Sequence, residues 1–141
     1  MNTTNRLTKI IDSKFTFLVD DYGFQRHEED YRPDVFGSSS IVLESDELMI
    51  RLVFDGRDDN ISLEIKSPKT KDAGQPNLEE AGWFDAEMVR AIIAGSNFAV
   101  SAKNWDELAE FLKQNYLKIV DLFSPENLST TTKKLEGVVW K

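Results

Sequence analysis

The sequence predicts an α+β fold in a single domain spanning residues 1–141: an N-terminal helix, a three- to four-stranded antiparallel meander, and two to three C-terminal helices packed on one face. Apolar and polar residues alternate over 48–54 and 61–65, which is typical of strands with one buried face. Apolar residues recur at helical spacing over 105–123. Three antiparallel strands with one apolar face are not stable alone in water, so we expect helices to cover that face.

The first helix is predicted over residues 5–22, because Leu7, Ile11 and Leu18 fall on one helical face. Gly23 suits the left-handed position that follows a last helical turn. The next stretch, 24–32, has two interpretations: a polar edge strand of the meander, or a loop.

The central hairpin has a register that its apolar pattern selects. Residues 55–60 supply the turn, with Gly56 and Asn60 tolerant of positive φ. A slip of one residue would place apolar side chains opposite polar ones. The predicted partners are Phe54 with Ile61, Leu52 with Leu63, Ile50 with Ile65, and Arg51 with Glu64.

The preceding strand is predicted to join this hairpin through a tight turn at Ser45 and Asp46. That turn would pair Leu43 with Leu48, Ile41 with Ile50, and Val42 with Met49. The outer face of the sheet then carries several apolar residues, and we expect Trp83 and the tail 138–140 to cover it. The alternative interpretation of this outer face is a contact surface.

Two cap signals organise the chain after the long irregular stretch 67–82. Asp85 is a predicted N-cap for a helix that runs to about Ala94, and Gly95 ends that helix. Asn104 is the predicted cap of the longest helix, with Glu107 in the third position.

The C-terminal end of the chain reads as one more helix and a tail. Ser124 is the predicted cap of the final helix and Pro125 its first residue, with an end near Leu135. Residues 98–100 suggest a short extended piece, and the apolar tail 138–140 is expected to dock on the body.

The composition narrows the classes of function. Lys and Arg number 17 against 25 Asp and Glu, a net charge of −8, which argues against nucleic acid as a partner and permits a basic protein. The chain has no Cys, so disulfides and thiolate chemistry are excluded. Neither a signal peptide nor an apolar run long enough for a membrane span is visible, so we expect a cytoplasmic protein that does not bind membranes.

Metal and cofactor motifs are not found in the sequence. The only histidine, His27, begins a His-Glu stretch, but a zinc helix needs a second histidine. The turn at 55–60 resembles a calcium loop in composition only, since Asn60 and Lys66 stand where that loop requires Gly and Glu. We therefore expect neither a metal nor a cofactor, and we read both segments as solvated polar structure.

Catalytic motifs are equally sparse. Glycine-rich phosphate loops and a nucleophile elbow are missing, and a Ser–His arrangement would have to use His27. No pair of carboxyl groups occurs in a distinctly apolar stretch that would separate their pKa values. We therefore expect no catalytic residues and a protein that is not an enzyme.

Clustered acidic residues on loops are the remaining functional signal, because they can steer a basic partner. The candidates lie in the polar stretch after the first helix and at the tip of the central hairpin. The predicted partner-binding residues are Glu28, Glu29, Asp30, Asp55, Asp58 and Asp59.

The order of elements carries a resemblance. Tyr22-Gly23-Phe24 follows the first helix, Trp83-Phe84-Asp85 opens the second, and Trp105 precedes Leu108-Ala109 and Phe111-Leu112. In this arrangement the chain resembles small uncharacterised bacterial α+β proteins, some of which are immunity proteins that neutralise polymorphic toxins. The early half also looks like an acidic type III secretion chaperone, but the later pair of strands that such a chaperone needs is not evident.

These observations favour a non-enzymatic protein-binding module, of the immunity or inhibitor type that the resemblance implies. The alternatives are a small hydrolase or nuclease that uses carboxylates, and a dimeric secretion chaperone. An enzyme would need a concave site where polar groups converge, which separates it from a binding module.

Overall fold

The computed structural model describes residues 4–32, 38–57, 60–68, 82–100 and 104–140. The helices are α1 (Thr4–Lys14), α2 (Thr16–Tyr22), α3 (Ala86–Ile93), α4 (Trp105–Leu122) and α5 (Leu128–Glu136). The strands are β1 (Gln25–Arg32), β2 (Ser38–Glu44), β3 (Met49–Asp55), β4 (Asn60–Lys66), β5 (Phe84–Asp85), β6 (Phe98–Ala99) and β7 (Val139–Trp140).

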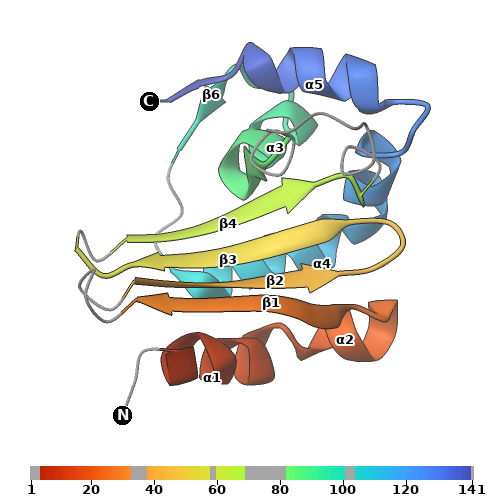
Figure 1. Cartoon of the computed structure of the whole chain (residues 1–141). Coiled ribbons are helices and arrows are strands. Elements are labelled where there is room, and N and C mark those ends of the chain that lie inside the picture. The colour runs from red at the N-terminus through yellow and green to blue at the C-terminus, as the bar shows by residue number, and fades with distance from the viewer. Residues whose placement is uncertain (1–3, 33–37, 58–59, 69–81, 101–103, 141) are drawn as a thin grey trace, which may run out of the picture.

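The α+β prediction is confirmed. Strands β1 to β5 form one antiparallel sheet in sequence order, so the predicted meander has four full strands and gains a short fifth. Helix α4 lies behind the sheet and α1 packs on β1, β2 and α4 (Figure 1). Helix α3 packs beside β4 and β5, and α5 packs on α3 (Figure 1). The C-terminal helices thus form more than a single layer on one face.

The core lies between the sheet and the helices. Strand residues that point inward include Ile50, Leu52 and Leu63, all fully buried. They meet buried residues of α4, including Leu112 and Ile119, in one continuous cluster. This packing follows from the two periodicities in the sequence, two for the strands and 3.6 for the helix.

The prediction of one helix over 5–22 was wrong, because the chain bends at Phe15 between α1 and α2. Phe15 has φ −119° and ψ 15°, outside the helical range. Ile11, Phe15 and Leu18 are nevertheless all buried, as their helical spacing predicts. The Phe15 ring meets the Trp105 ring edge-on at 6.2 Å between centroids, which fixes the bend against α4.

The predicted register of the central hairpin is confirmed at every pair. Phe54 is opposite Ile61, and Arg51 is opposite Glu64. The Arg51 Nε donates to the Glu64 carboxylate at 2.7 Å, and both side chains are 21% exposed. This cross-strand ion pair is consistent with the alternation that selected the register.

The predicted pairing of the preceding strand was wrong by two residues. Leu43 is opposite Ile50, Ile41 opposite Leu52 and Val42 opposite Arg51. The connection is longer than expected because Ser45 organises it: the Ser45 N–H donates to the Leu48 carbonyl at 2.9 Å. A shift of two keeps every side chain on its predicted face, so the core pattern survives the error.

Residues 25–32 form a strand, β1, so the edge-strand interpretation of that stretch is confirmed. Its pairing with β2 shifts between Arg26 and Glu28, which leaves His27 as the extra residue of a β-bulge. The acidic residues that follow, Glu28 to Asp30, pair through their backbones with Val42 to Ser40.

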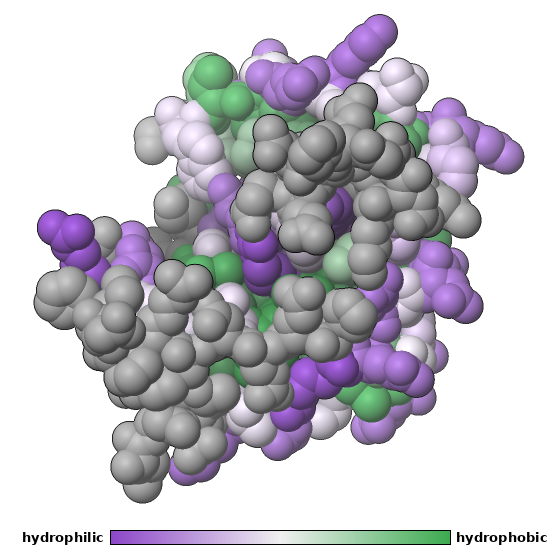
Figure 2. Space-filling model, viewed as in Figure 1, coloured by the Kyte–Doolittle hydropathy of each residue, from purple (hydrophilic) through white to green (hydrophobic). Residues whose placement is uncertain are grey.

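The outer face of the sheet is partly covered within the chain. The Trp83 ring lies 4.5 Å from the guanidinium carbon of Arg51 and 5.5 Å from the Lys66 ammonium, so the expectation for Trp83 is confirmed. The expectation that the tail would also cover this face was wrong, because β7 pairs in parallel with β6 instead. Seen from the outer face, the surface mixes hydrophilic and hydrophobic residues (Figure 2).

The helix starts show which cap signals were informative. The Asn104 side chain accepts from the Glu107 N–H at 2.8 Å, which confirms the predicted cap. Asp85 occupies the N-cap position of α3, but its carboxylate makes no capping hydrogen bond. The final helix begins at Leu128 rather than Pro125, because the N–H groups of Asn127 and Leu128 both bond to the Ser124 carbonyl and form a turn first.

Among the described residues, no helix combines the length and the apolar character that crossing a membrane requires.

Candidate functional site

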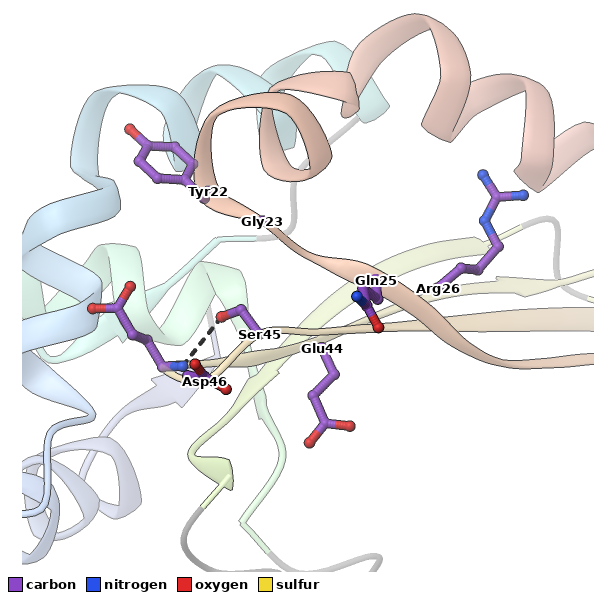
Figure 3. Close-up of a pocket in the computed structure, with 8 residues that line it drawn as sticks. Tyr22, Gly23, Gln25, Arg26, Glu44, Ser45 and Asp46 are labelled. Atoms are coloured by element: carbon purple, nitrogen blue, oxygen red, sulfur yellow. Dashed lines mark hydrogen bonds between the residues drawn. The ribbon is translucent and has the colours of Figure 1, made fainter.

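An acidic cleft lies at the end of the sheet where the β2–β3 turn is found. Its volume is about 560 Å³. Figure 3 shows the connection from α2 to β1 lying beside the end of the β2–β3 hairpin, so that two segments distant in sequence form the walls. The lining residues, here called the acidic cleft, are Tyr22, Gly23, Gln25, Arg26, Glu44, Ser45, Asp46 and Glu47.

One wall depends on a reversal at Gly23. Its φ of 72° is in the left-handed region, which glycine adopts without steric cost. The N–H groups of Gly23 and Phe24 both bond to the Leu18 carbonyl, so the chain turns sharply from α2 into β1. Phe24 is buried and anchors the turn in the core. This reversal places Tyr22 on one side of the cleft and Arg26 on the other.

The opposite wall is the Ser45 turn. The Ser45 Oγ accepts from the N–H groups of Glu47 and Leu48, each at 3.2 Å, which holds the turn closed (Figure 3). The next two side chains, Asp46 and Glu47, are exposed as a result, and Glu44 is half-buried. Three carboxylates therefore come from four consecutive residues.

Charge in the acidic cleft is unbalanced. Three of the lining residues, Glu44, Asp46 and Glu47, are acidic and one, Arg26, is basic, so the formal charges of the lining residues sum to −2. Arg26 also donates to the Asp12 carboxylate at 3.1 Å, which diverts part of its charge toward α1. The cleft is thus a site of negative potential that suits a cation.

An aromatic pair lies under the cleft. The rings of Tyr22 and Tyr116 stack with centroids 3.6 Å apart and planes at 12°. Burial, and then the charge of Glu47, raises the pKa of Tyr116 to about 12. The Ser45 hydroxyl opposes this rise, but its geometry falls short of a hydrogen bond, and the Tyr116 hydroxyl has no partner among the described residues. The pair gives the cleft a rigid, apolar side.

A smaller apolar hollow of about 170 Å³ adjoins the cleft and shares Asp46 and Glu47 with it. Val120, Phe123 and Pro125 line its other side. Acidic and apolar recognition surfaces are therefore continuous at this end of the molecule.

A second group of charges lies on the outer face of the sheet. Asp85 is opposite Glu64 across β4 and β5, and Glu64 is paired with Arg51. The pKa of Asp85 is raised to about 6, mainly by burial and then by the charges of Glu64 and Glu87. The charge of Arg51 opposes this rise. This pair could not be predicted from the sequence, because no local pattern indicates that Asp85 joins the sheet as β5.

The structure describes part of the set of residues predicted as partner-binding. Asp55 is half-buried at the hairpin end of the sheet, where its carboxylate accepts from the Arg57 N–H at 3.0 Å and stabilises the turn. Asp58 and Asp59 lie outside the described residues. Glu28, Glu29 and Asp30 are placed on β1 by their backbones alone.

Asp55, the predicted residue whose side chain the structure describes, does not line the acidic cleft. The sequence did contain a signal for it: an acidic run, Glu44 to Glu47, interrupted by a turn-forming serine. What the sequence could not indicate was that Tyr22 and Arg26 would face that run. Within the part of the chain that the structure describes, no three His, Asp or Glu side chains are grouped as a metal site would require.

Comparisons with models of protein families, with curated proteins and with solved structures find no match to this chain.

Proposed function

We propose that the protein is a non-enzymatic binding module of the immunity or inhibitor type, and that its acidic cleft receives a basic segment of a partner protein. One observation carries this proposal: three acidic residues and a single basic one, Arg26, are among the eight residues that line a cleft of about 560 Å³. Because neither a signal peptide nor an apolar run long enough for a membrane span is visible, we expect the protein to act in the cytoplasm.

The physical argument starts from repulsion between like charges. Asp46 and Glu47 are adjacent and exposed, and Glu44 is close by in sequence. A lysine or arginine from a partner would offset that repulsion, and clustered acids accelerate the approach of a basic surface. Tyr22 adds an aromatic wall, against which a guanidinium can stack.

The adjoining hollow suggests how such a partner would gain affinity as well as speed. Exposed charge at the rim of an interface mostly sets the association rate, whereas a buried apolar anchor slows dissociation. The hollow beside Phe123 and Pro125 would accept one apolar side chain next to the basic residue. A basic–apolar segment is therefore the partner chemistry that we propose.

The test begins with the tagged protein purified from its host at low salt, followed by binding kinetics with each captured protein. We expect Asp46→Lys with Glu47→Lys to slow association by about tenfold or more, because the charge at the cleft is reversed. The association rate for the unmodified protein is also expected to fall as salt rises toward about 1 M.

Two matched pairs control for total charge. Glu110→Lys with Glu136→Lys makes the same charge change at exposed sites outside the cleft, and we expect a much smaller effect. Asp58→Lys with Asp59→Lys tests the hairpin tip that the sequence predicted. The proposal fails if the Asp46 and Glu47 variant binds every captured partner as quickly as the two other pairs.

A small carboxylate-dependent hydrolase or nuclease is the second candidate, favoured by the pairing of Asp85 with Glu64 and by the raised pKa of Asp85. An acid with a pKa of about 6 beside an ionised carboxylate can divide the roles of proton donor and base. Turnover of plasmid DNA or nitrophenyl esters that vanishes in Asp85→Asn and Glu64→Gln would favour this candidate. No loss in those variants would remove it.

A further inference from the structure

The Tyr116 hydroxyl is a buried polar group whose hydrogen bonds are not accounted for within the folded chain. Tyr116 is 2% exposed, and its hydroxyl has no hydrogen-bond partner among the described residues. Buried polar groups in folded proteins nearly always have such a partner, because a buried group that makes no hydrogen bond bears the full cost of losing water. This hydroxyl therefore has the capacity for a hydrogen bond that a bound group can supply.

The aromatic packing around Tyr116 fixes where that hydroxyl lies. The Tyr22 ring stacks on the Tyr116 ring with 3.6 Å between centroids, and the Phe24 ring meets it edge-on at 6.1 Å. Both neighbours belong to the reversal at Gly23, whereas Tyr116 belongs to α4. Because two rings hold the Tyr116 ring, its hydroxyl does not turn toward another part of the core.

The hydroxyl lies toward the wall of the acidic cleft. Burial, and then the charge of Glu47, raises the pKa of Tyr116 to about 12, and the Ser45 hydroxyl opposes this rise. Ser45 and Glu47 both line the acidic cleft, so the polar groups that act on the Tyr116 hydroxyl are those of the cleft itself. With this pKa the hydroxyl is neutral near neutral pH, so it can donate one hydrogen bond and accept another.

The acidic residues at this end of the cleft are not neutralised by the other lining residues. Neither Asp46 nor Glu47 forms an ion pair within the part of the chain that the structure describes. Arg26, the one basic residue among those that line the cleft, pairs with Asp12 on α1. Figure 3 shows the Arg26 side chain well apart from Tyr22 and Asp46. Negative charge and a buried hydroxyl without a partner are therefore found together.

We propose that the acidic cleft selects arginine over lysine in the basic segment of its partner, and that the Tyr116 hydroxyl determines this selection. The guanidinium pairs with the Glu47 carboxylate through two N–H groups and donates another hydrogen bond to the Tyr116 hydroxyl oxygen. This inference rests on the proposed function, because it concerns the residue that the acidic cleft receives. It also agrees with the net charge of −8, which favours a cationic ligand.

Two properties of the guanidinium favour it over an ammonium group at this position. Its five N–H donors lie in one plane, so two can bind a carboxylate while another points to a neighbouring acceptor. It is also more weakly hydrated than an ammonium group. A cation that contacts the hydroxyl of a buried tyrosine must give up water on that side, and the guanidinium does so at lower cost. Lysine pairs with the carboxylates from the solvent side and leaves the hydroxyl without a partner.

The test compares three short, capped peptides in which a leucine lies beside two arginines, two lysines or two citrullines. Citrulline has the shape of arginine without its charge. Each peptide is titrated into the isotope-labelled full chain and followed by backbone NMR. We expect saturable shifts centred on residues 22–26, 44–48 and 116, with an affinity for the arginine peptide about tenfold higher than for the lysine peptide. The citrulline peptide is expected to give no saturable shifts.

One variant isolates the hydroxyl, because Tyr116→Phe removes it and keeps the stacked ring. We expect Tyr116→Phe to weaken binding of the arginine peptide about tenfold and of the lysine peptide less than about twofold, so that the preference disappears. A purely structural role for the hydroxyl would not change the ratio of the two affinities. Thermal melts verify that the variant is folded.

The matched control is Ser39→Ala. It too removes a buried hydroxyl that has no partner among the described residues. Ser39 lies near the start of β2, whereas the acidic cleft is at the end of that strand. We expect Ser39→Ala to bind both cationic peptides as the unmodified chain does.

The outcomes separate this inference from the proposed function. Asp46→Lys with Glu47→Lys is expected to abolish binding of both cationic peptides, which places them in the cleft. Equal affinities for the arginine and lysine peptides, or a preference for arginine that persists in Tyr116→Phe, would refute the selection by Tyr116 and leave the cleft as a site for basic segments. Shifts that do not saturate by about 1 mM peptide would also refute this inference. The proposed function fails only if the charge-reversed cleft binds every captured partner at an unchanged rate.

Discussion

Asp85 and Glu64 are direct cross-strand partners on β5 and β4, two acids side by side on one ladder. Burial, and then the charges of Glu64 and Glu87, together raise the pKa of Asp85 to about 6. Between pH 3.8 and about 6 the folded protein therefore holds a proton on Asp85 that the unfolded chain has already released. This linkage makes the short strand β5 sensitive to pH.

The first prediction concerns Asp85→Asn. Since the folded pKa exceeds the unfolded one, the contribution of Asp85 to stability is fully present below pH 3.8 and is lost as the pH rises through 6. At pH 7.5 we expect the variant to be more stable by about 1–2 kcal/mol, a value discounted for partial solvent screening. Urea melts at several pH values check this, and the advantage is expected to shrink as the pH falls below 6. An advantage that does not vary with pH would contradict the linkage.

The second prediction compares neighbours on β3. Leu52 is fully buried in the core, whereas Val53 is half-buried on the outer face. We expect Leu52→Ala to lower the free energy of unfolding by about 2–5 kcal/mol, since it leaves a cavity, and Val53→Ala to lower it by less. Chemical denaturation of both variants provides the measurement. Equal losses would mean that both faces of the sheet are equally buried.

The third prediction isolates the Tyr116 hydroxyl. That group is buried without a hydrogen-bond partner among the described residues, so removing it breaks no hydrogen bond. We expect Tyr116→Phe to be neutral or stabilising by up to about 1 kcal/mol. Tyr116→Ala, which also removes the stack on Tyr22, is expected to cost about 3–5 kcal/mol. A clear destabilisation by the Phe variant would reveal a hydrogen bond to that hydroxyl.

The fourth prediction concerns the reversal at Gly23. A Cβ added there would meet no atom within 4 Å, so any cost of Gly23→Ala comes from its φ of 72° alone. We expect a loss of about 1–2 kcal/mol, and a smaller loss for Gly23→Asn, because Asn enters the left-handed region more readily. Thermal or urea melts are sufficient. Indistinguishable Ala and Asn variants would show that the turn relaxes out of this conformation.

The sequence predicted the parts of the fold that depend on local periodicity. The register from Phe54 to Ile61 and the cap at Asn104 follow from alternation and from side-chain chemistry within a few residues. The errors arise where a tertiary contact decides. The helix is interrupted at Phe15, whose ring contacts the Trp105 ring. The Ser45 turn shifts the pairing of β2 with β3 by two residues and leaves each side chain on its predicted face.

The candidate site was harder to predict for the same reason. The acidic run at the Ser45 turn is visible in the sequence, but the cleft requires α2 and β1 to bring Tyr22 and Arg26 against it. The pairing of Asp85 with Glu64 likewise depends on contact across 21 positions of sequence, from 64 to 85. Local patterns carry no information about which distant elements will meet.

The bulge at His27 affects how readily β1 could pair with a strand of another molecule. Strand β1 lies at the edge of the described sheet and spans eight residues, long enough to template the growth of a sheet from one molecule to the next. The bulge disrupts its ladder, and five of its eight residues are charged: Arg26, Glu28, Glu29, Asp30 and Arg32. A neighbouring chain would have to bury those charges against an irregular backbone. The bulge and the charges therefore disfavour edge-to-edge pairing of β1 with another molecule.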